Sequence, residues 1–468
     1  MAPVDSTRVS GGPDIEAVVG RVRATYESGR TRPMQWRRDQ LDGLLRLLDR
    51  EQEILVDALA TDVGKPRLES RVADLMMTAA EVRHLRKHAP RWARSRRVSL
   101  PLVSRPGRAE IRPEPLGVGL VIAPWNYPVQ LLIQPMATAI AAGNAVVGKP
   151  SELAPATAAA LARLIPRYVD PEAIAVIEGG VAVATALLEQ PWDHIFFTGS
   201  ATVGQVVMAA AARQLTPLIL ELGGKSPVIV DDSAALAVTA RRIAWGKWLN
   251  AGQSCIAPDY VLVGKDNRDE LVAGITAAFD AFADRAVRMT PDFGRIIDER
   301  HAQRLEGLLV DHGGHLASGG SVDVVARFVE PTVIVDPDPD SPLMTEEVFG
   351  PILPVVTVES TEAAIDFVNR RPKPLALYVF AEDLEIADHV VDATSSGGAV
   401  VNHVLVHKTP SLPFGGVGQS GMGRYHGRAG FDHYSNAKGV LHKSTKHDLS
   451  VIYPPYTRLK EGIIRRIL

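Results

Sequence analysis

The hydrophobic residues of this chain form two helical stretches near the N-terminus and then change to an alternation of strands and helices. Leucines at positions 41, 44, 45, 47 and 48 recur at helical spacing, and a second periodic stretch covers residues 72–85. From residue 118, short apolar runs alternate with alanine-rich helical stretches. The pattern predicts strands at 118–123, 145–148, 173–177, 194–198 and 218–220, and helices at 131–142, 156–168, 182–189 and 202–213. Such alternation is typical of βαβ units on a parallel sheet.

A second α/β series follows the first. Its predicted strands are 228–230, 260–263, 332–335, 352–358 and 377–380, and its predicted helices are 235–248, 269–282, 361–369 and 384–393. We therefore expect two α/β blocks joined near Leu222, which agrees with a length of 468 residues. After residue 411 the chain is glycine-rich and irregular, and then polar.

Composition adds few constraints. Lys and Arg number 51 against 54 for Asp and Glu, so no net charge favours nucleic acid or an acidic membrane as a partner. The start of the chain does not resemble a signal peptide, and no apolar stretch is long enough for a membrane span. The single cysteine allows no intrachain disulfide, which favours a reducing, cytoplasmic location. Residues 462–468 are apolar and basic, and we interpret them as a docked or frayed tail rather than a membrane contact.

Two familiar motifs fail on their context. Residues 416–421 read GVGQSG and match a dinucleotide fingerprint, but no strand precedes them and no apolar helix follows. We therefore expect a loop there. Residues 224–226 read GKS, like the end of a phosphate-binding P-loop, but the required upstream glycine would fall at Ile219.

A longer set of motifs carries more weight because its members occur together and in order. The set reads LGV (116–118), APWNYP (123–128), AGN (142–144), KPSE (149–152), FTGSATVG (197–204), LELGGKSP (220–227), NAGQSC (250–255), EVFGP (347–351) and PFGG (413–416). In order and spacing it resembles the aldehyde dehydrogenase superfamily. RIAWGK (242–247), KPLALY (373–378) and TSSGG (394–398) point to the class 3 type, which includes fatty and aromatic aldehyde dehydrogenases. The resemblance covers residues 15–455, and it departs at Gly148, where a bulkier apolar residue is usual.

Three residues are the candidates for chemistry. Cys255 alone would be interpreted as a buried, inert thiol, but its flanking residues match the family's nucleophile, and a thiol needs activation at neutral pH. Asn126 follows a predicted strand at the edge where α/β sheets bind ligands. The resemblance implies that it stabilises an oxyanion together with the Cys255 N–H, although an Asx turn would also explain it. Glu221 ends an apolar strand, so we expect a raised pKa. The resemblance makes it the base that activates water; otherwise it would be a surface acid.

The resemblance also implies a cofactor site. Lys149 and Glu152 would bind the adenine ribose, and the charge of Glu152 would favour NAD while leaving NADP possible. The turn from Gly199 to Gly204, with Ser200 and Val203, opens a predicted helix whose N–H groups suit a pyrophosphate; plain capping by Ser200 is also compatible. Glu347 would bind the nicotinamide ribose, with Phe349 beside the nicotinamide, and Trp125 is a further expected cofactor-binding residue. No metal site is predicted, and we interpret His403 and His407 as structural.

The implied fold is a Rossmann-like parallel-sheet cofactor domain, a second α/β catalytic domain and a small β bridging element for oligomerisation. We assign residues 1–95 and 113–221 to the NAD(P)-binding domain, 222–397 to the catalytic domain, 96–112 and 398–440 to the bridging element, and 441–468 to a C-terminal tail. Class 3 relatives are typically dimers, so a homodimer is expected.

The predicted function is NAD(P)-dependent oxidation of an aldehyde, medium- or long-chain aliphatic or aromatic, to the carboxylic acid. Cys255 would attack the aldehyde, and Glu221 would activate the water that hydrolyses the resulting thioester. A CoA-acylating dehydrogenase is the main alternative, and Glu221 argues against it. A thioesterase-like cysteine hydrolase would leave the cofactor residues without a purpose, and a non-catalytic scaffold would leave Asn126, Glu221 and Cys255 unexplained.

Overall fold

The computed structural model describes residues 14–101, 104–284, 286–446, 448 and 450–467. The first 13 residues, which the predicted cofactor domain includes, lie outside the described residues. The predicted leucine helix is α2 (Met34–Arg50), which buries Leu41, Leu44 and Leu47 in the core. The second predicted helix begins as a wider π-helical segment, η1 (Ser70–Met76), and continues as α5 (Met77–Trp92). The other N-terminal helices are α1 (Ile15–Glu27), α3 (Gln52–Val63) and α4 (Arg67–Glu69).

The first sheet contains six strands in the order β17-β7-β6-β3-β4-β5. Its strands are β3 (Val118–Ile122), β4 (Ala145–Lys149), β5 (Ile174–Val176), β6 (His194–Thr198), β7 (Leu218–Glu221) and β17 (Gly421–Met422). The helices between them are α6 (Pro128–Ala142), α7 (Pro155–Tyr168), α8 (Val181–Leu188) and α9 (Ala201–Gln214). From β3 the chain proceeds outward to β4 and β5, and then returns to the other side of β3 for β6 and β7. A crevice between β3 and β6 at such a switch point is where α/β sheets bind ligands.

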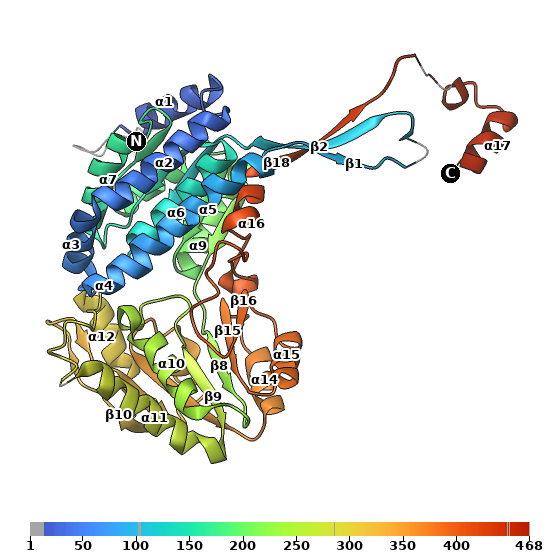
Figure 1. Cartoon of the computed structure of the whole chain (residues 1–468). Coiled ribbons are helices and arrows are strands. Elements are labelled where there is room, and N and C mark those ends of the chain that lie inside the picture. Colours follow the sequence, from blue (N-terminus) through green and yellow to red (C-terminus); the bar gives the residue numbers. More distant parts are fainter. Residues whose placement is uncertain (1–13, 102–103, 285, 447, 449, 468) are drawn as a thin grey trace, which may run out of the picture.

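The second sheet contains seven strands in the order β10-β13-β14-β9-β8-β15-β16, and it lies in the lower half of Figure 1. Its strands are β8 (Pro227–Val230), β9 (Tyr260–Gly264), β10 (His315–Ser318), β13 (Thr332–Val335), β14 (Ile352–Val358), β15 (Ala376–Phe380) and β16 (Gly398–Val401). Its helices are α10 (Leu236–Trp248), α11 (Lys265–Ala283), α12 (Glu299–Leu308), α13 (Pro342–Thr345), α14 (Thr361–Asn369) and α15 (Leu384–Ala393). A small hairpin pairs β11 (Val322–Asp323) with β12 (Phe328–Val329). Apart from the antiparallel edge strand β10, neighbouring strands of the second sheet are parallel, as the alternation predicts.

The third sheet is a narrow arm that projects from the body of the molecule (Figure 1). It joins β1 (Arg96–Val98), β2 (Arg108–Pro115) and β18 (Ser435–His442) in antiparallel pairs. Much of β18 is exposed, so it shows no apolar run, and the sequence pattern missed it. The glycine-rich region contributes η4 (Gly418–Ser420) and α16 (Gly427–His433), and η5 (Ser450–Ile452) and α17 (Arg458–Ile467) follow the arm.

The sheets divide the chain differently from the predicted boundaries. β16 pairs with β15, so the seven-stranded sheet continues past residue 397. β2 extends to Pro115, and β18 continues to His442, so the arm takes residues that we had assigned to the cofactor domain and to the tail. The segment assigned to the C-terminal tail contains helix α17. These boundaries depend on strand pairing, which local periodicity does not report.

Candidate active site

Cys255 lies on a tightly held loop that follows α10. The loop begins with η3 (Leu249–Gly252), where Asn250 and Ala251 adopt left-handed backbone angles with φ of 52° and 50°. Gly252 comes so close to Gly350 that an added Cβ would lie 2.2 Å from its carbonyl oxygen. The Gln253 side chain braces the loop, because Nε2 donates to the Asn250 carbonyl and Oε1 accepts from the Ile297 N–H. The thiol is therefore presented from a rigid turn.

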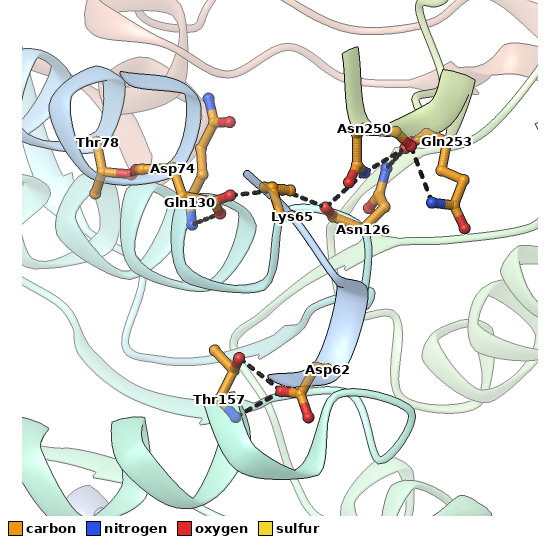
Figure 2. A network of polar contacts seen from close by, with 9 residues as sticks. All are labelled: Asp62, Lys65, Asp74, Thr78, Asn126, Gln130, Thr157, Asn250 and Gln253. Carbon is orange, nitrogen blue, oxygen red and sulfur yellow. Dashed lines mark hydrogen bonds and ion pairs between the residues drawn. The ribbon is translucent and has the colours of Figure 1, made fainter. Parts of the chain in front are cut away.

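Asn126 reaches the same loop from the six-stranded sheet, because it follows β3 at the switch point of that sheet. Its Nδ2 donates to the Gln253 carbonyl at 3.2 Å, and its own carbonyl accepts from Lys65 Nζ at 2.9 Å and Asn250 Nδ2 at 3.0 Å (Figure 2). Asn126 Oδ1 has no hydrogen-bond partner among the described residues, so the Asx turn does not form. The Asn126 side chain is buried. Its Nδ2 is held by the Cys255 loop, and its backbone carbonyl is held by Lys65 and Asn250.

Glu221 is the last residue of β7 and is only 3% exposed, so it is not a surface acid. Neither carboxylate oxygen has a hydrogen-bond partner among the described residues. Burial raises its pKa well above the usual range, and the Arg424 charge opposes this only in part. The strand-end position and the raised pKa agree with the prediction made from the sequence.

Glu347 is a second carboxylate at the site; the residue is half-buried, and its Oε1 is buried. Burial and the nearby Asp259 charge raise its pKa to about 8, and its Oε1 lacks a partner among the described residues. A Cβ on Gly223 would lie 2.0 Å from Glu347 Oε2, so only glycine leaves room for this carboxylate. Lys225 holds the segment before Glu347 by donating to the Glu346 carbonyl at 2.8 Å and pairing with Asp259.

Lys225 and Asp259 are positioning residues that sequence reasoning missed. Asp259 Oδ1 accepts from the Val348 N–H at 3.0 Å, so the pair grips the chain on both sides of Glu347. The failed P-loop match included Lys225, and its partners show why it is not free to hold a phosphate. The spacing of 34 residues between Lys225 and Asp259 leaves no local signal for their contact.

Burial, with a smaller effect of the neighbouring acids, keeps the Cys255 thiol protonated at rest. Burial raises the pKa of Cys255 to about 12, and the nearby Glu347 and Glu221 act in the same direction. Lys408 opposes the rise. With a pKa of about 8, the Glu347 carboxyl is largely neutral at pH 7.

Several of the predicted cofactor residues follow strands of the first sheet at its carboxyl edge. Lys149 ends β4, and its Nζ lies 2.6 Å from Glu152 Oε2. Ser200 caps α9 by accepting from the Val203 N–H, and Gly199 donates its N–H to the Glu221 carbonyl. Gly204 lies against Leu222, where a Cβ would come within 2.6 Å of the leucine side chain.

The rings of Trp125, Phe349 and His301 lie together. Phe349, which has a left-handed φ of 47°, meets the Trp125 ring edge-on with centroids 5.4 Å apart. His301 lies 5.4 Å from the same indole. A nearby surface cleft is lined by Glu152, Leu153 and Val181 from the first unit and by Asp298, Glu299 and Arg300 from the second, among other residues.

Other sequence-level expectations concern single side chains. At Gly148, where the family usually has a bulkier residue, β4 stays in continuous register with β3 and β5, and Met136 fills the space. His407 is buried against Phe414 and Tyr378, and burial lowers its pKa to about 4. His403 is half-buried beside Trp245. In the described part of the chain, no cluster of acidic, histidine and cysteine side chains could hold a metal ion.

Comparison with known proteins shows the family of the chain. The model of the aldehyde dehydrogenase family matches residues 2–440. The chain belongs to the aldehyde dehydrogenase family. The dehydrogenase is 44% identical to rat aldehyde dehydrogenase family 3 member A2, over 95% of this chain and 92% of the relative. It is 45% identical to a rat relative named "Aldehyde dehydrogenase, dimeric NADP-preferring", over 94% of this chain and 98% of the relative.

Solved structures show the same fold. The substrate-bound AldH of Staphylococcus aureus superposes with a TM-score of 0.93 at 40% identity, covering 97% of this chain and 99% of that chain. The betaine aldehyde dehydrogenase of the same organism, a variant in complex with NAD+, gives a TM-score of 0.85 at 27% identity, covering 94% and 91%. The predicted fold class and family are confirmed, and the protein is an aldehyde-oxidising enzyme of a family that uses NAD(P). Among the described helices, none has the length and apolar character needed to cross a membrane.

Proposed function

We propose that this dehydrogenase converts a medium- or long-chain aliphatic or aromatic aldehyde to the carboxylic acid through a thioester on Cys255, with Glu221 as the base for hydrolysis. The observation that carries this proposal is the buried Glu221 carboxylate, whose two oxygens have no partner among the described residues at the same site as the chain's only thiol. A carboxylate in this state is available for a water molecule. A CoA-dependent reaction would not require it.

Asn126 supplies the oxyanion donor in this proposal. An amide nitrogen carries two N–H donors, and only one of them is used by the Gln253 carbonyl. The second can donate to the oxygen of the aldehyde as Cys255 adds to its carbon, and the Cys255 N–H is the other expected donor. Because Lys65 and Asn250 hold the Asn126 backbone, the donor is preorganised before substrate binds.

Proton transfer follows from the raised pKa values. The resting Cys255 thiol has to lose its proton before it attacks, and Glu221 has to be ionised before it accepts a proton from water. Both requirements favour the reaction as pH rises. We therefore expect hydrolysis of the thioester to accelerate with pH on a limb set by Glu221.

The cofactor residues fit a nicotinamide dinucleotide. Glu347 has an orphaned buried oxygen that suits a ribose hydroxyl, Lys149 can donate to a second ribose, and the start of α9 presents N–H groups for the phosphates. When bound, the nicotinamide supplies the oxidant for the aldehyde carbon. Trp125 and Phe349 would flank its ring.

Glu152 beside Lys149 would repel a 2′-phosphate, so we propose NAD as the preferred cofactor and NADP as the weaker one. Glu152→Gln should raise kcat/KM for NADP relative to NAD; an unchanged ratio would contradict the assignment.

We further propose a cytoplasmic homodimer. The projecting arm leaves β1 and β18 as the edges of a narrow sheet that another protomer could cover. A lone catalytic thiol also needs a reducing compartment to stay reactive. Light scattering on the purified enzyme tests the dimer, and a monomer would overturn it.

The decisive experiment compares the wild type with Cys255→Ala and Glu221→Gln. Reduced cofactor is followed by absorbance with a panel of aldehydes, and folding is checked by circular dichroism. Cys255→Ala should abolish turnover. Glu221→Gln should retain a rapid first turnover and then stall with the thioester in place. Unchanged turnover in Cys255→Ala would refute the mechanism. Normal turnover in Glu221→Gln would show that Glu221 is not the base. Formation of acyl-CoA in place of the acid would favour the CoA-acylating alternative.

A further inference from the structure

Lys408 is a cation at the active site that the mechanism above does not use. It lies on the loop after β16, is half-buried, and places its Nζ 5.0 Å from the centre of the Tyr127 ring. Among the described residues its ammonium group has no ion-pair partner and donates no side-chain hydrogen bond, although most charged groups at this depth are paired. Burial lowers its pKa, while the nearby Cys255 and Asp74 favour the charged form.

Lys65 lies near the same Tyr127 ring as Lys408, but its ammonium group is fully partnered. Its Nζ lies 3.9 Å from the centre of the same Tyr127 ring, but it pairs with Asp74 at 2.7 Å and donates to the Asn126 carbonyl. Glu69 is the other acid nearby. It makes no ion pair among the described residues, and burial raises its pKa to about 7, so it is only partly ionised at neutral pH. The positive charge of Lys408 therefore remains incompletely balanced.

The Lys408 loop borders the Cys255 loop on two sides. Tyr127, under the Lys408 ammonium, follows Asn126 directly, and its hydroxyl lies close enough to Cys255 for the charge of the thiolate to add to the effect of burial in raising the pKa of Tyr127. On the other side, His407 packs against Tyr378, whose hydroxyl donates to the Ile256 carbonyl. Ile256 follows Cys255 directly in the chain. A substrate held at Cys255 is thus within the electrostatic reach of Lys408.

We propose that Lys408 is a specificity-determining residue whose ammonium group binds an anionic group, such as a carboxylate, on the aldehyde substrate. The proposal rests on the function proposed above, because it requires the aldehyde carbon to reach Cys255. An anionic group on the substrate would balance the positive charge of Lys408, which the described protein groups balance only in part. Aldehydes with a terminal carboxylate are then better substrates than neutral aldehydes of equal length.

The first test uses alkylation of Cys255, which needs neither cofactor nor turnover. The thiolate displaces iodide from iodoacetate, which is anionic, or from iodoacetamide, which is neutral, and the single cysteine gives one site of reaction. Rates are compared for wild type, Lys408→Met, Lys408→Arg and Lys265→Met, an exposed-lysine control at the start of α11. We expect Lys408→Met to lower the iodoacetate-to-iodoacetamide rate ratio by about tenfold, as befits a charge pair partly shielded from water. Lys408→Arg should preserve much of the ratio, and the control should leave it unchanged.

Equal slowing of both reagents in Lys408→Met would overturn the proposal, because Lys408 would then only stabilise the thiolate. An unchanged ratio would overturn it as well. The second test measures kcat/KM for 4-oxobutanoate against butanal, and for longer pairs of the same design. Lys408→Met should raise KM for the oxo acids with little effect on kcat or on the neutral aldehydes. If no aldehyde is oxidised but iodoacetate selectivity depends on Lys408, the anion site stands and the proposed dehydrogenase mechanism fails.

Discussion

Lys65 and Asp74 form an ion pair whose side chains are both 0% exposed, with Nζ and Oδ2 2.7 Å apart. Figure 2 shows the pair inside a network that connects η1 to the Cys255 loop. Lys65 also donates to the Asn126 carbonyl, and Asp74 Oδ1 accepts from the Gln130 N–H at 3.3 Å. Replacing Lys65 by methionine keeps the length of the side chain but leaves Asp74 as a buried charge without its cation.

The expected cost follows from the burial. Removing one member of a buried ion pair typically destabilises a protein by about 3–5 kcal/mol, whereas neutralising both members costs little. With a conversion of about 2–4 °C per kcal/mol for a domain of this size, Tm should fall by roughly 6–20 °C in Lys65→Met. Asp74→Asn in the same chain removes the orphaned charge while keeping the acceptor for Gln130, so the double variant should recover most of the loss.

The assay is thermal unfolding at one fixed scan rate, since a protein with several structural units need not unfold reversibly. Activity provides a second reading. Because Asn250 still holds the Asn126 carbonyl in Lys65→Met, kcat measured below Tm should fall less than the ~10²–10³-fold expected for loss of an oxyanion donor. A single variant within 2 °C of wild type, or a double variant less stable than Lys65→Met, would refute the reasoning. The bound of 2 °C corresponds to roughly 1 kcal/mol or less.

Three further predictions concern other buried positions. Asn126→Ala should lower kcat by about 10²–10³-fold with little change in KM, because it removes a donor used in the transition state; steady-state kinetics check this, and a change in KM alone would contradict it. Gly148→Leu should destabilise by about 1–3 kcal/mol, because its Cβ would lie 2.7 Å from Met136 Sδ, and a Met136→Ala companion should relieve the clash in thermal unfolding. Lys247→Met should stabilise by up to about 3 kcal/mol at pH 7, because Lys247 is fully buried, its Nζ has no partner among the described residues, and burial lowers its pKa to about 8. The unfolded state binds the Lys247 proton more tightly than the folded state, so the wild type gains stability as pH rises above 8. The difference in free energy of unfolding between Lys247→Met and wild type should therefore shrink, and a difference that stays constant to pH 10 would contradict the assignment.

Residue order alone predicted much of the secondary structure, because the two sheets obey simple local rules. The five strands from β3 to β7 are short apolar runs between helices, as expected for strands covered on both faces. The position of Glu221 at the end of one such run led us to expect a raised pKa, but without the resemblance it indicated a surface acid, and only the structure shows that the side chain is buried. β18 was missed for the opposite reason: it pairs within an exposed arm and needs no apolar residues.

What the sequence by itself determined was therefore the order of most strands of the two large sheets and the family, and it supplied the prediction of the reacting side chains. Only the tertiary structure decided how these side chains are held and charged. Lys65 contacts the carbonyl of Asn126 across 61 positions, and Lys225 grips the chain beside Glu347 across 121. Lys408 lies near enough to Cys255 for its charge to lower the pKa of the thiol, although more than 150 positions separate them. Periodicity reports which face of an element is buried, but burial and charge at a site are set by residues distant in the chain, and these meet only when the sheets assemble.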